Sequence, residues 1–202
     1  RIDDEKMSKS LGNFFTVREV LNNYDPEVIR YFILTSQYRS PLNYSTEQLD
    51  QAKNALTRFY TALRDIEVDR NVNWQEDTEF GPRFKEAMDD DFNTALALSV
   101  MADTRLTLNK AQEKGEQTQV SYLASLLHSF GEVLGLFQQS ADTFLAGDAS
   151  DDEAAKIEAL IAARNTARAD KDWAKADQVR DELSEMGIVL EDNAGQTTWR
   201  RV

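Results

Sequence analysis

The sequence predicts a mainly α-helical protein, in which an α-helical bundle is followed by a small α+β unit made of a helical hairpin and a β-hairpin. Over residues 49–66, and again over residues 120–137, apolar side chains recur at steps of three and four, which places them along one face of an α-helix. Near the C-terminus, two short runs, 188–190 and 197–201, flank a turn that contains Gly195. Two such runs around a glycine turn predict a β-hairpin.

The first two helices are predicted from their start signals. Thr16 and Glu19 have the spacing of a capping box, so a short helix should run through Leu21. Asp25-Pro26 predicts a second helix over residues 27–37, because Asp is a favoured N-cap and Pro fits the first helical turn.

Three long helices should form the bundle. The first opens at the capping-box pattern of residues 45–48, and its apolar stripe consists of Leu49, Ala52, Leu56, Phe59, Tyr60, Leu63 and Ile66. The second, ending near residue 114, is predicted to start in the string of residues 89–94, with the three aspartates at its N-terminus because carboxylates accept from the free N–H groups of a first turn. The stripe of the third is Val120, Leu123, Leu127, Phe130, Leu134 and Phe137, a spacing typical of antiparallel bundles.

The segment between the first two long helices is less regular. Residues 67–81 are polar and predict a loop that ends at Gly81-Pro82, and residues 84–88 predict a short helix.

After the bundle, residues 141–152 are small, polar and acidic and predict a linker. Ser150 should cap the next helix, which is interrupted at residues 170–172. A second helix from Trp173 should end at Gly187, with glycine at the C′ position.

The composition excludes several kinds of site. The chain has 202 residues, no cysteine and one histidine, so neither a disulfide nor a zinc site built on thiolates or histidines is expected, and no residue is predicted to bind metal. His128 lies beside the apolar stripe of the third long helix, where a flanking residue is a better interpretation than a catalyst. No apolar run has the roughly 20 residues of a membrane span, so we expect a cytoplasmic protein without membrane contact.

The net charge of −13 first argues against a nucleic-acid partner. The acid is unevenly spread, however: the formal charge is 0 over residues 1–40, −12 over residues 41–163 and −1 over residues 164–202. Both ends of the chain therefore remain able to contact phosphate.

The string Lys6-Met7-Ser8-Lys9-Ser10, followed by Leu11-Gly12-Asn13, has the composition of a loop that binds polyphosphate. Two ammonium groups and two hydroxyls supply donors for phosphate oxygens, where negative charge grows during nucleotidyl transfer. The string resembles the signature loop of class I aminoacyl-tRNA synthetases. That resemblance implies that Lys9 binds the ATP phosphates and that Lys6 assists.

Further strings narrow the resemblance to one family. The segments Tyr24 to Glu27, Tyr38 to Ser45, Ala87 to Thr94 and Asp172 to Trp199 resemble cysteinyl-tRNA synthetase, and nearly all of the chain is covered. The resemblance implies a phosphate loop with connecting helices in residues 1–45, an anticodon-binding type of bundle in 46–140, a linker in 141–152 and an anticodon-recognition unit in 153–202. Arg30 and Arg39 would lie near the inside corner of the tRNA and are candidates for backbone contact.

The resemblance implies a cysteine–tRNA ligase that joins cysteine to tRNA-Cys, using ATP and Mg²⁺. In this family zinc selects the cysteine thiolate, and its ligands would lie upstream of this chain. The first residue is not Met, and neither a dinucleotide-binding pattern nor a His-x-Gly-His element occurs in the sequence. We therefore expect a C-terminal part of a longer enzyme, monomeric, able to bind tRNA and inactive alone.

The last fifty residues carry the chemistry of a base-reading surface. Arginines and lysines alternate with aspartates, and two tryptophans lie among them. Guanidinium groups suit guanine, carboxylates accept from amino groups, and indole rings stack on unpaired bases. The resemblance implies a contact set of Arg168, Trp173, Asp177 and Asp192, with Arg168 on the anticodon guanine; for Trp173 core packing is an even alternative, and for Trp199 it is the better interpretation.

Two alternatives remain open at this point. The cysteine ligase of mycothiol synthesis shares the phosphate loop but lacks an anticodon-reading terminus. An acidic helical module that binds a basic protein, without any tRNA binding, is the alternative from another functional class.

Overall fold

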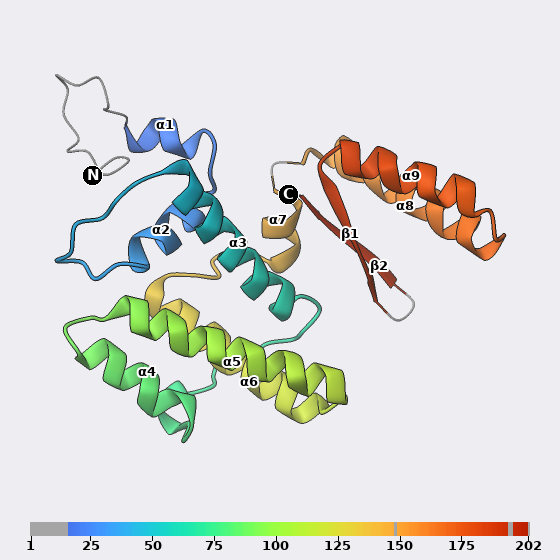
Figure 1. Cartoon of the computed structure of the whole chain (residues 1–202). Helices are drawn as coiled ribbons and strands as arrows, with labels where there is room; N and C mark the ends of the chain where they lie inside the picture. The colour runs from blue at the N-terminus through green and yellow to red at the C-terminus, as the bar shows by residue number, and fades with distance from the viewer. Residues whose placement is uncertain (1–15, 148, 194–195, 202) are drawn as a thin grey trace. The chain divides into compact units, whose positions relative to one another are not determined.

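The computed structural model describes residues 16–147, 149–193 and 196–201. The chain divides into two compact units, residues 1–141 and residues 142–202, here called unit 1 and unit 2. Unit 1 is helical, and unit 2 combines helices with a two-stranded antiparallel sheet. In Figure 1 the strands are the red arrows near the C-terminus. The predicted fold class is confirmed.

Unit 1 begins with two short helices, α1 (Val17–Leu21) and α2 (Pro26–Leu34). Both start signals act as predicted: Thr16 and Glu19 form a complete capping box, and the Asp25 carboxylate accepts from the N–H of Glu27 at 2.7 Å. The second helix ends three residues before the predicted Gln37, with Thr35 as its C-cap.

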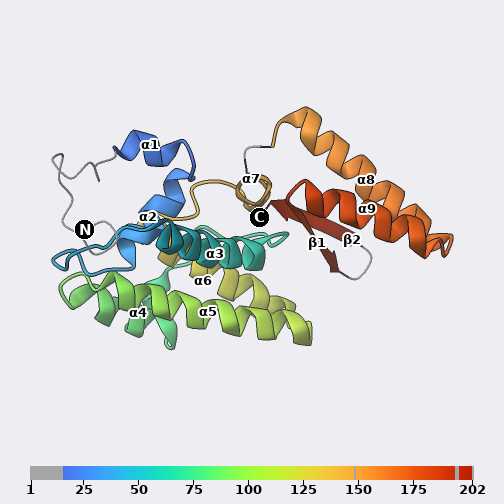
Figure 2. The same ribbon diagram turned by 45° about the horizontal axis from the view of Figure 1, so that its top comes forward.

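The bundle consists of α3 (Thr46–Leu63), α4 (Phe80–Asp89), α5 (Thr94–Lys114) and α6 (Gln117–Leu134). In both views α5 and α6 run side by side, with α4 next to them (Figures 1 and 2). The predicted stripes form the core: the buried set includes Leu49, Ala52, Leu56, Phe59, Tyr60 and Leu63 on α3, and Val120, Leu123, Leu127, Phe130 and Leu134 on α6. Ile66 lies beyond the end of α3 and is only half-buried.

A buried carboxylate links α2 to the end of the bundle. Glu27 accepts from the hydroxyl of Tyr60 at 2.9 Å and from the backbone N–H of Phe137 at 2.7 Å. The second bond joins segments 110 residues apart, and both satisfy a carboxyl group that would otherwise be costly to bury.

The start of α4 differs from the prediction, because Gly81-Pro82 lies inside the helix rather than in a loop. The Asp77 carboxylate accepts from the N–H groups of Glu79, Phe80 and Gly81 at 2.5–3.0 Å and so opens the helix early. Pro82 is tolerated there, because a first turn leaves N–H groups without helical partners. A 3₁₀ turn, η2 (Trp74–Glu76), precedes it and places Trp74 against the rings of Phe84 and Phe130.

The helix α5 starts within the predicted string, at Thr94, but the prediction that the three aspartates cap it was wrong. Asp89 is the last residue of α4, and the side chain of Asn93 caps α5 by accepting from the N–H of Leu96. Between them, Asp91 and Phe92 have positive φ angles of 49° and 54°. A residue between α2 and α3 stabilises this turn, since the hydroxyl of Tyr38 donates to the Asp91 carboxylate at 2.9 Å.

Unit 2 contains α7 (Ala141–Ala146, whose first residue belongs to unit 1), α8 (Asp151–Ala169), α9 (Trp173–Glu185), β1 (Ile188–Asn193) and β2 (Gln196–Arg201). Ser150 caps α8, Gly187 follows α9 with a φ of 74°, and the two strands form the predicted hairpin. The segment interpreted as a linker thus contains a short helix, and Ala146 in it packs on the core of this unit. That core consists of Ile157, Ile161, Val179, Leu183, Ile188 and Trp199.

Within the residues that the structure describes, none of the helices is both long enough and apolar enough to cross a membrane.

Candidate nucleic-acid interface

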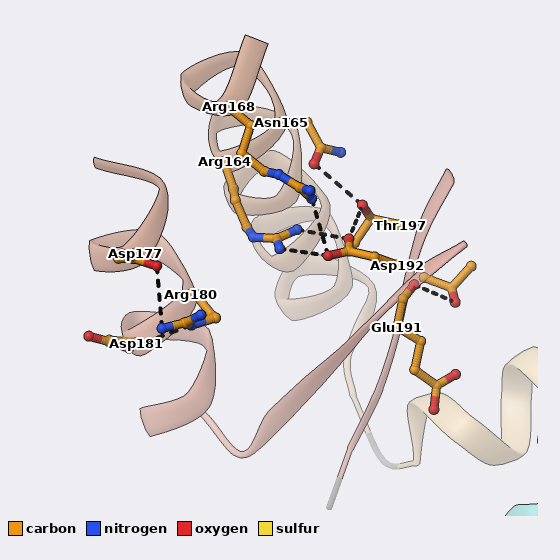
Figure 3. Close-up of polar contacts among 10 residues, drawn as sticks. Arg164, Asn165, Arg168, Asp177, Arg180, Asp181, Glu191, Asp192 and Thr197 are labelled. Carbon is orange, nitrogen blue, oxygen red and sulfur yellow. Dashed lines mark hydrogen bonds and ion pairs between the residues drawn. The ribbon is translucent and has the colours of Figure 1, made fainter. Parts of the chain in front are cut away.

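The centre of the candidate interface is a two-pronged ion pair between α8 and β1. The terminal nitrogens of Arg164 donate to the two oxygens of Asp192 at 3.0 and 2.7 Å (Figure 3). The Arg164 side chain is 10% exposed and that of Asp192 is 41% exposed. A bidentate guanidinium–carboxylate pair of this kind fixes orientation as well as position.

Asp192 has two further donors. Arg168 donates to the same oxygen as the nearer prong of Arg164 at 3.1 Å, and the hydroxyl of Thr197 lies 2.8 Å from the other oxygen. A carboxylate offers about four lone-pair positions, so the four contacts use all of them. The hydrogen bonds of Arg164, followed by that of Thr197 and the charge of Arg168, hold the pKa of Asp192 well below its ordinary value, although burial opposes the shift.

The local fold explains why these side chains meet. Arg164 and Arg168 are four residues apart and therefore share one face of α8, the face that carries the core residues Ile157 and Ile161 further up the helix. Asp192 and Thr197 are direct partners in the hairpin register. Packing of α8 on the shared core thus brings the arginines to the end of the hairpin at which β1 leads into β2.

Asp177 approaches the same cluster from α9. It pairs with Arg180 at 3.3 Å on its own helix, where both side chains are exposed (Figure 3). Its charge also helps to raise the pKa of Arg164, after the larger effect of Asp192. Asp177 is therefore within electrostatic range of the buried arginine without contacting it.

The two tryptophans of unit 2 have different environments. Trp173 is the first residue of α9, just after the N-cap Asp172, and its side chain is 61% exposed. Trp199 on β2 is only 7% exposed, and its indole N–H donates to Glu158 at 2.7 Å. The core interpretation is confirmed for Trp199, whereas Trp173 is free to offer a ring face to a ligand.

Only some of the four residues in the expected contact set are brought together by the fold. Arg168 and Asp192 touch, and Asp177 acts on the cluster through its field. Among the described residues, Trp173 takes no part in the hydrogen bonds and ion pairs of this cluster. Sequence reasoning placed Arg164 on the same helix as Ile157 and Ile161 and among the basic residues of the unit, but not in the contact set. Its spacing of seven from Ile157 and three from Ile161 is the signal that it extends the buried face.

The phosphate-loop residues Lys6 and Lys9 lie outside the described residues. Of the two arginines considered for backbone contact, Arg30 donates its Nε to the carbonyl of Leu134 at 2.6 Å and so helps to close the end of α6. Arg39 is 70% exposed, stacks on the ring of Tyr38 and lies 3.4 Å from Asp91. Arg39 therefore keeps donors toward solvent, whereas Arg30 has a role within the fold.

Zinc does not fit the donor set of the described chain. Within it no three histidine, cysteine, aspartate or glutamate side chains are grouped as metal ligands would be. His128, the single histidine, is buried on α6 with Glu132 at 3.8 Å, and burial lowers its pKa despite that carboxylate. It is more buried than a flanking position predicts, because the ring packs near Phe137.

Three family models match the chain in succession. Residues 1–54 match the class I (C) tRNA synthetase catalytic domain, residues 83–138 match the DALR domain, and residues 150–200 match the cysteinyl-tRNA ligase anticodon binding domain. The last match contains the whole arginine–aspartate cluster.

Curated relatives match along the full chain. It is 54% identical over 201 residues to a cysteine–tRNA ligase of Idiomarina loihiensis, and 51% identical over 201 residues to that of Colwellia psychrerythraea. In both cases the alignment covers 100% of this chain and 43% of the relative. A cysteine–tRNA ligase of Vibrio cholerae is 51% identical over 200 residues, with 99% and 43% covered. The chain therefore belongs to the cysteinyl-tRNA synthetase family and spans 43% of the length of these curated members.

Proposed function

We propose that this chain binds tRNA-Cys and that unit 2 reads its anticodon, as part of a cysteine–tRNA ligase. The match of residues 150–200 to an anticodon-binding model supports an RNA partner for unit 2. The observation that carries the residue assignment is the half-exposed guanidinium of Arg168, held near the turn end of the hairpin by a carboxylate that is itself fixed by Arg164.

In this proposal the four contact residues have different tasks. Arg168 donates to the anticodon guanine, and Trp173 stacks on a base. When Arg168 turns to the guanine, one lone pair of Asp192 is released and accepts from a base amino group, while Arg164 keeps the carboxylate in place. Asp177 exchanges Arg180 for a second amino group.

The rest of the enzyme follows from the family. We propose that the whole ligase activates cysteine with ATP and transfers it to tRNA, with Lys9 and Lys6 of the phosphate loop binding the phosphates together with Mg²⁺. Zinc, where the enzyme uses it, is held by residues outside this chain. We further propose that the protein acts in the cytoplasm as a monomer, with domain limits at residues 45, 140 and 152.

The test compares binding of two tRNA-Cys transcripts, one with the natural anticodon and one with its guanine replaced. We expect the chain to prefer the natural transcript by about ten-fold or more, because a bidentate contact to guanine contributes about 1–3 kcal/mol of discrimination. Arg168→Ala should abolish the preference, and Lys156→Ala, an exposed charge on the same helix, should keep it. Equal binding of both transcripts by the unaltered chain would contradict the proposal.

A second pair of variants tests the role of Arg164. Arg164→Lys retains the charge but not the fork, so the preference should fall. If Arg164 acts through Arg168, adding Arg164→Lys to Arg168→Ala should cause no further loss of preference. A further loss in the double variant would mean that Arg164 has an independent effect on the RNA.

A further inference from the structure

A neutral groove crosses the surface of unit 1. It has a volume of about 400 Å³ and lies between the second half of α2, residues 41–43 and the first half of α3. Aromatic, hydroxyl and amide side chains line it, including Tyr31, Phe32, Asn43, Gln48 and Gln51. No carboxylate belongs to this lining among the described residues, although residues 41–163 carry a formal charge of −12.

One arginine lies a helical turn beyond the groove lining, and a second packs on a ring behind it. Arg58 is on α3 at spacings of seven and three from the lining residues Gln51 and Ala55, so the three share one helix face. The guanidinium carbon of Arg105 on α5 is 5.8 Å from the ring centroid of Phe59.

Aromatic packing connects the groove to both arginines. The rings of Tyr31, which lines the groove, and Phe59 lie 6.2 Å apart. Burial raises the pKa of Tyr31, and the charges of Arg105 and Arg58 oppose that shift. Burial and the like charge of Arg58 lower the pKa of Arg105. Packing thus connects the groove, the Phe59 ring and the Arg105 guanidinium, and Arg58 is within electrostatic range of both Tyr31 and Arg105.

Neither arginine has a counter-ion on its own helix. The residues three and four positions away are neutral: Asn54, Ala55, Thr61 and Ala62 around Arg58, and Met101, Ala102, Leu108 and Asn109 around Arg105. Over the part of the chain that the structure describes, no carboxylate forms an ion pair with either guanidinium. Arg83 in the same unit, by contrast, pairs with Asp103.

Two like charges within electrostatic range of each other, neither paired with a carboxylate, repel each other, and an anion placed between them would be stabilised. The aromatic and amide lining suits a ribose and a base rather than a second anion. The groove volume also falls within the range of about 300–1,000 Å³ seen for small-molecule sites.

We propose that Arg58, Arg105 and the adjoining groove form a second RNA contact of this chain, in which a phosphodiester binds the two guanidinium groups and its nucleotide enters the groove. The inference rests on the proposed binding of tRNA. It assigns this contact to unit 1 and predicts that it contributes affinity without reading the anticodon.

The test measures binding of the two transcripts described above, with natural and altered anticodon, at several salt concentrations. Arg58→Gln and Arg105→Gln should each weaken binding about ten-fold for both transcripts alike, and should reduce the slope of log affinity against log salt by about one unit. Arg83→Gln removes the same charge from the same unit and should change neither quantity. Because Arg58 is exposed and has no ion-pair partner to lose, its variant should melt at the wild-type temperature.

A groove variant provides a second readout. Gln48→Glu is isosteric, puts a carboxylate into the lining and strengthens the capping-box pattern with Ser45, so α3 should remain at least as stable. We expect weaker binding of both transcripts without a lower melting temperature. Gln112→Glu, an exposed position on α5, should bind like the unaltered chain.

The outcomes separate this inference from the anticodon proposal. If the unaltered chain prefers the natural anticodon but Arg58→Gln and Arg105→Gln bind like Arg83→Gln, the second contact is overturned and anticodon reading stands. If both transcripts bind equally and the two variants weaken both, the second contact stands and anticodon reading fails. A chain that binds neither transcript at low salt would overturn both.

Discussion

At the scale of single residues, Asp192 shows how a fully occupied carboxylate differs from an exposed one. Its four contacts come from Arg164, Arg168 and Thr197, and they hold its pKa below the ordinary value of 3.8. Because the pKa is lowered in the folded state, the carboxylate stabilises the fold above about pH 4. That contribution is lost as the pH falls from there toward the lower, folded-state pKa.

We predict that Asp192→Asn melts below the unaltered chain by a constant amount between about pH 5 and pH 8, and that the two melting temperatures converge as the pH is lowered from about 4 to 2. The measurement is thermal unfolding of unit 2 at a series of pH values. A gap that stays constant down to pH 2 would contradict the assignment of this ion pair.

The sequence identified the four residues of the proposed contact set but not the buried arginine behind them. Arg168, Trp173, Asp177 and Asp192 stand out by residue type and by resemblance, whereas the burial of Arg164 depends on how α8 packs against the hairpin. A pattern within one helix cannot supply that contact, since its partner Asp192 lies 28 residues further along.

At the scale of elements, the same distinction separates the helix starts that were predicted from those that were not. Thr16, Asp25, Ser45 and Ser150 act within three residues of themselves, so their capping could be predicted from the sequence alone. The start of α4 uses Asp77, whose other oxygen accepts from Tyr122 on α6 at 2.7 Å. A contact 45 residues away thus helps to fix where α4 begins.

Asp77 should therefore matter more than its half-exposed position indicates. Burial raises its pKa, but the N–H groups of Gly81 and Phe80 and the Tyr122 hydroxyl outweigh burial and lower it. We predict that Asp77→Ala lowers the stability of unit 1 by about 1–2 kcal/mol, because three N–H groups lose their acceptor. Denaturant unfolding followed by Trp74 fluorescence measures it.

Asp89 is the matched control, since it is an aspartate at the opposite end of the same helix. It pairs with Lys85 at the surface, and a negative charge at a helix C-terminus is unfavourable. Asp89→Ala should change stability by less than about 0.5 kcal/mol. Equal effects of the two substitutions would rule out the capping role of Asp77.

At the scale of the whole molecule, the two units have separate cores. That of unit 2 is built around Ile157, Leu183 and Trp199, and that of unit 1 around the facing stripes of the bundle. Unit 2 has only about sixty residues, a size at which stability is marginal and single core substitutions weigh heavily.

We predict two unfolding transitions in calorimetry. Ile157→Val should lower the transition of unit 2 by roughly 4–8 °C, the equivalent of about 1 kcal/mol for a domain of this size, and leave that of unit 1 unchanged. Leu126→Ala, in the core of the bundle, should move only the other transition. If either substitution shifts both transitions, the units are coupled.

The three tryptophans give this molecule three built-in optical probes. Trp74 packs on Phe84 and Phe130 in unit 1, Trp199 is buried in unit 2, and Trp173, itself a proposed anticodon contact, is exposed at the start of α9. Emission from the two packed indoles should shift to longer wavelength when their own unit unfolds. Emission from Trp173 should instead be quenched when a nucleobase stacks on it. Intrinsic fluorescence of the unlabelled chain can therefore report both the unfolding of each unit and the binding of RNA.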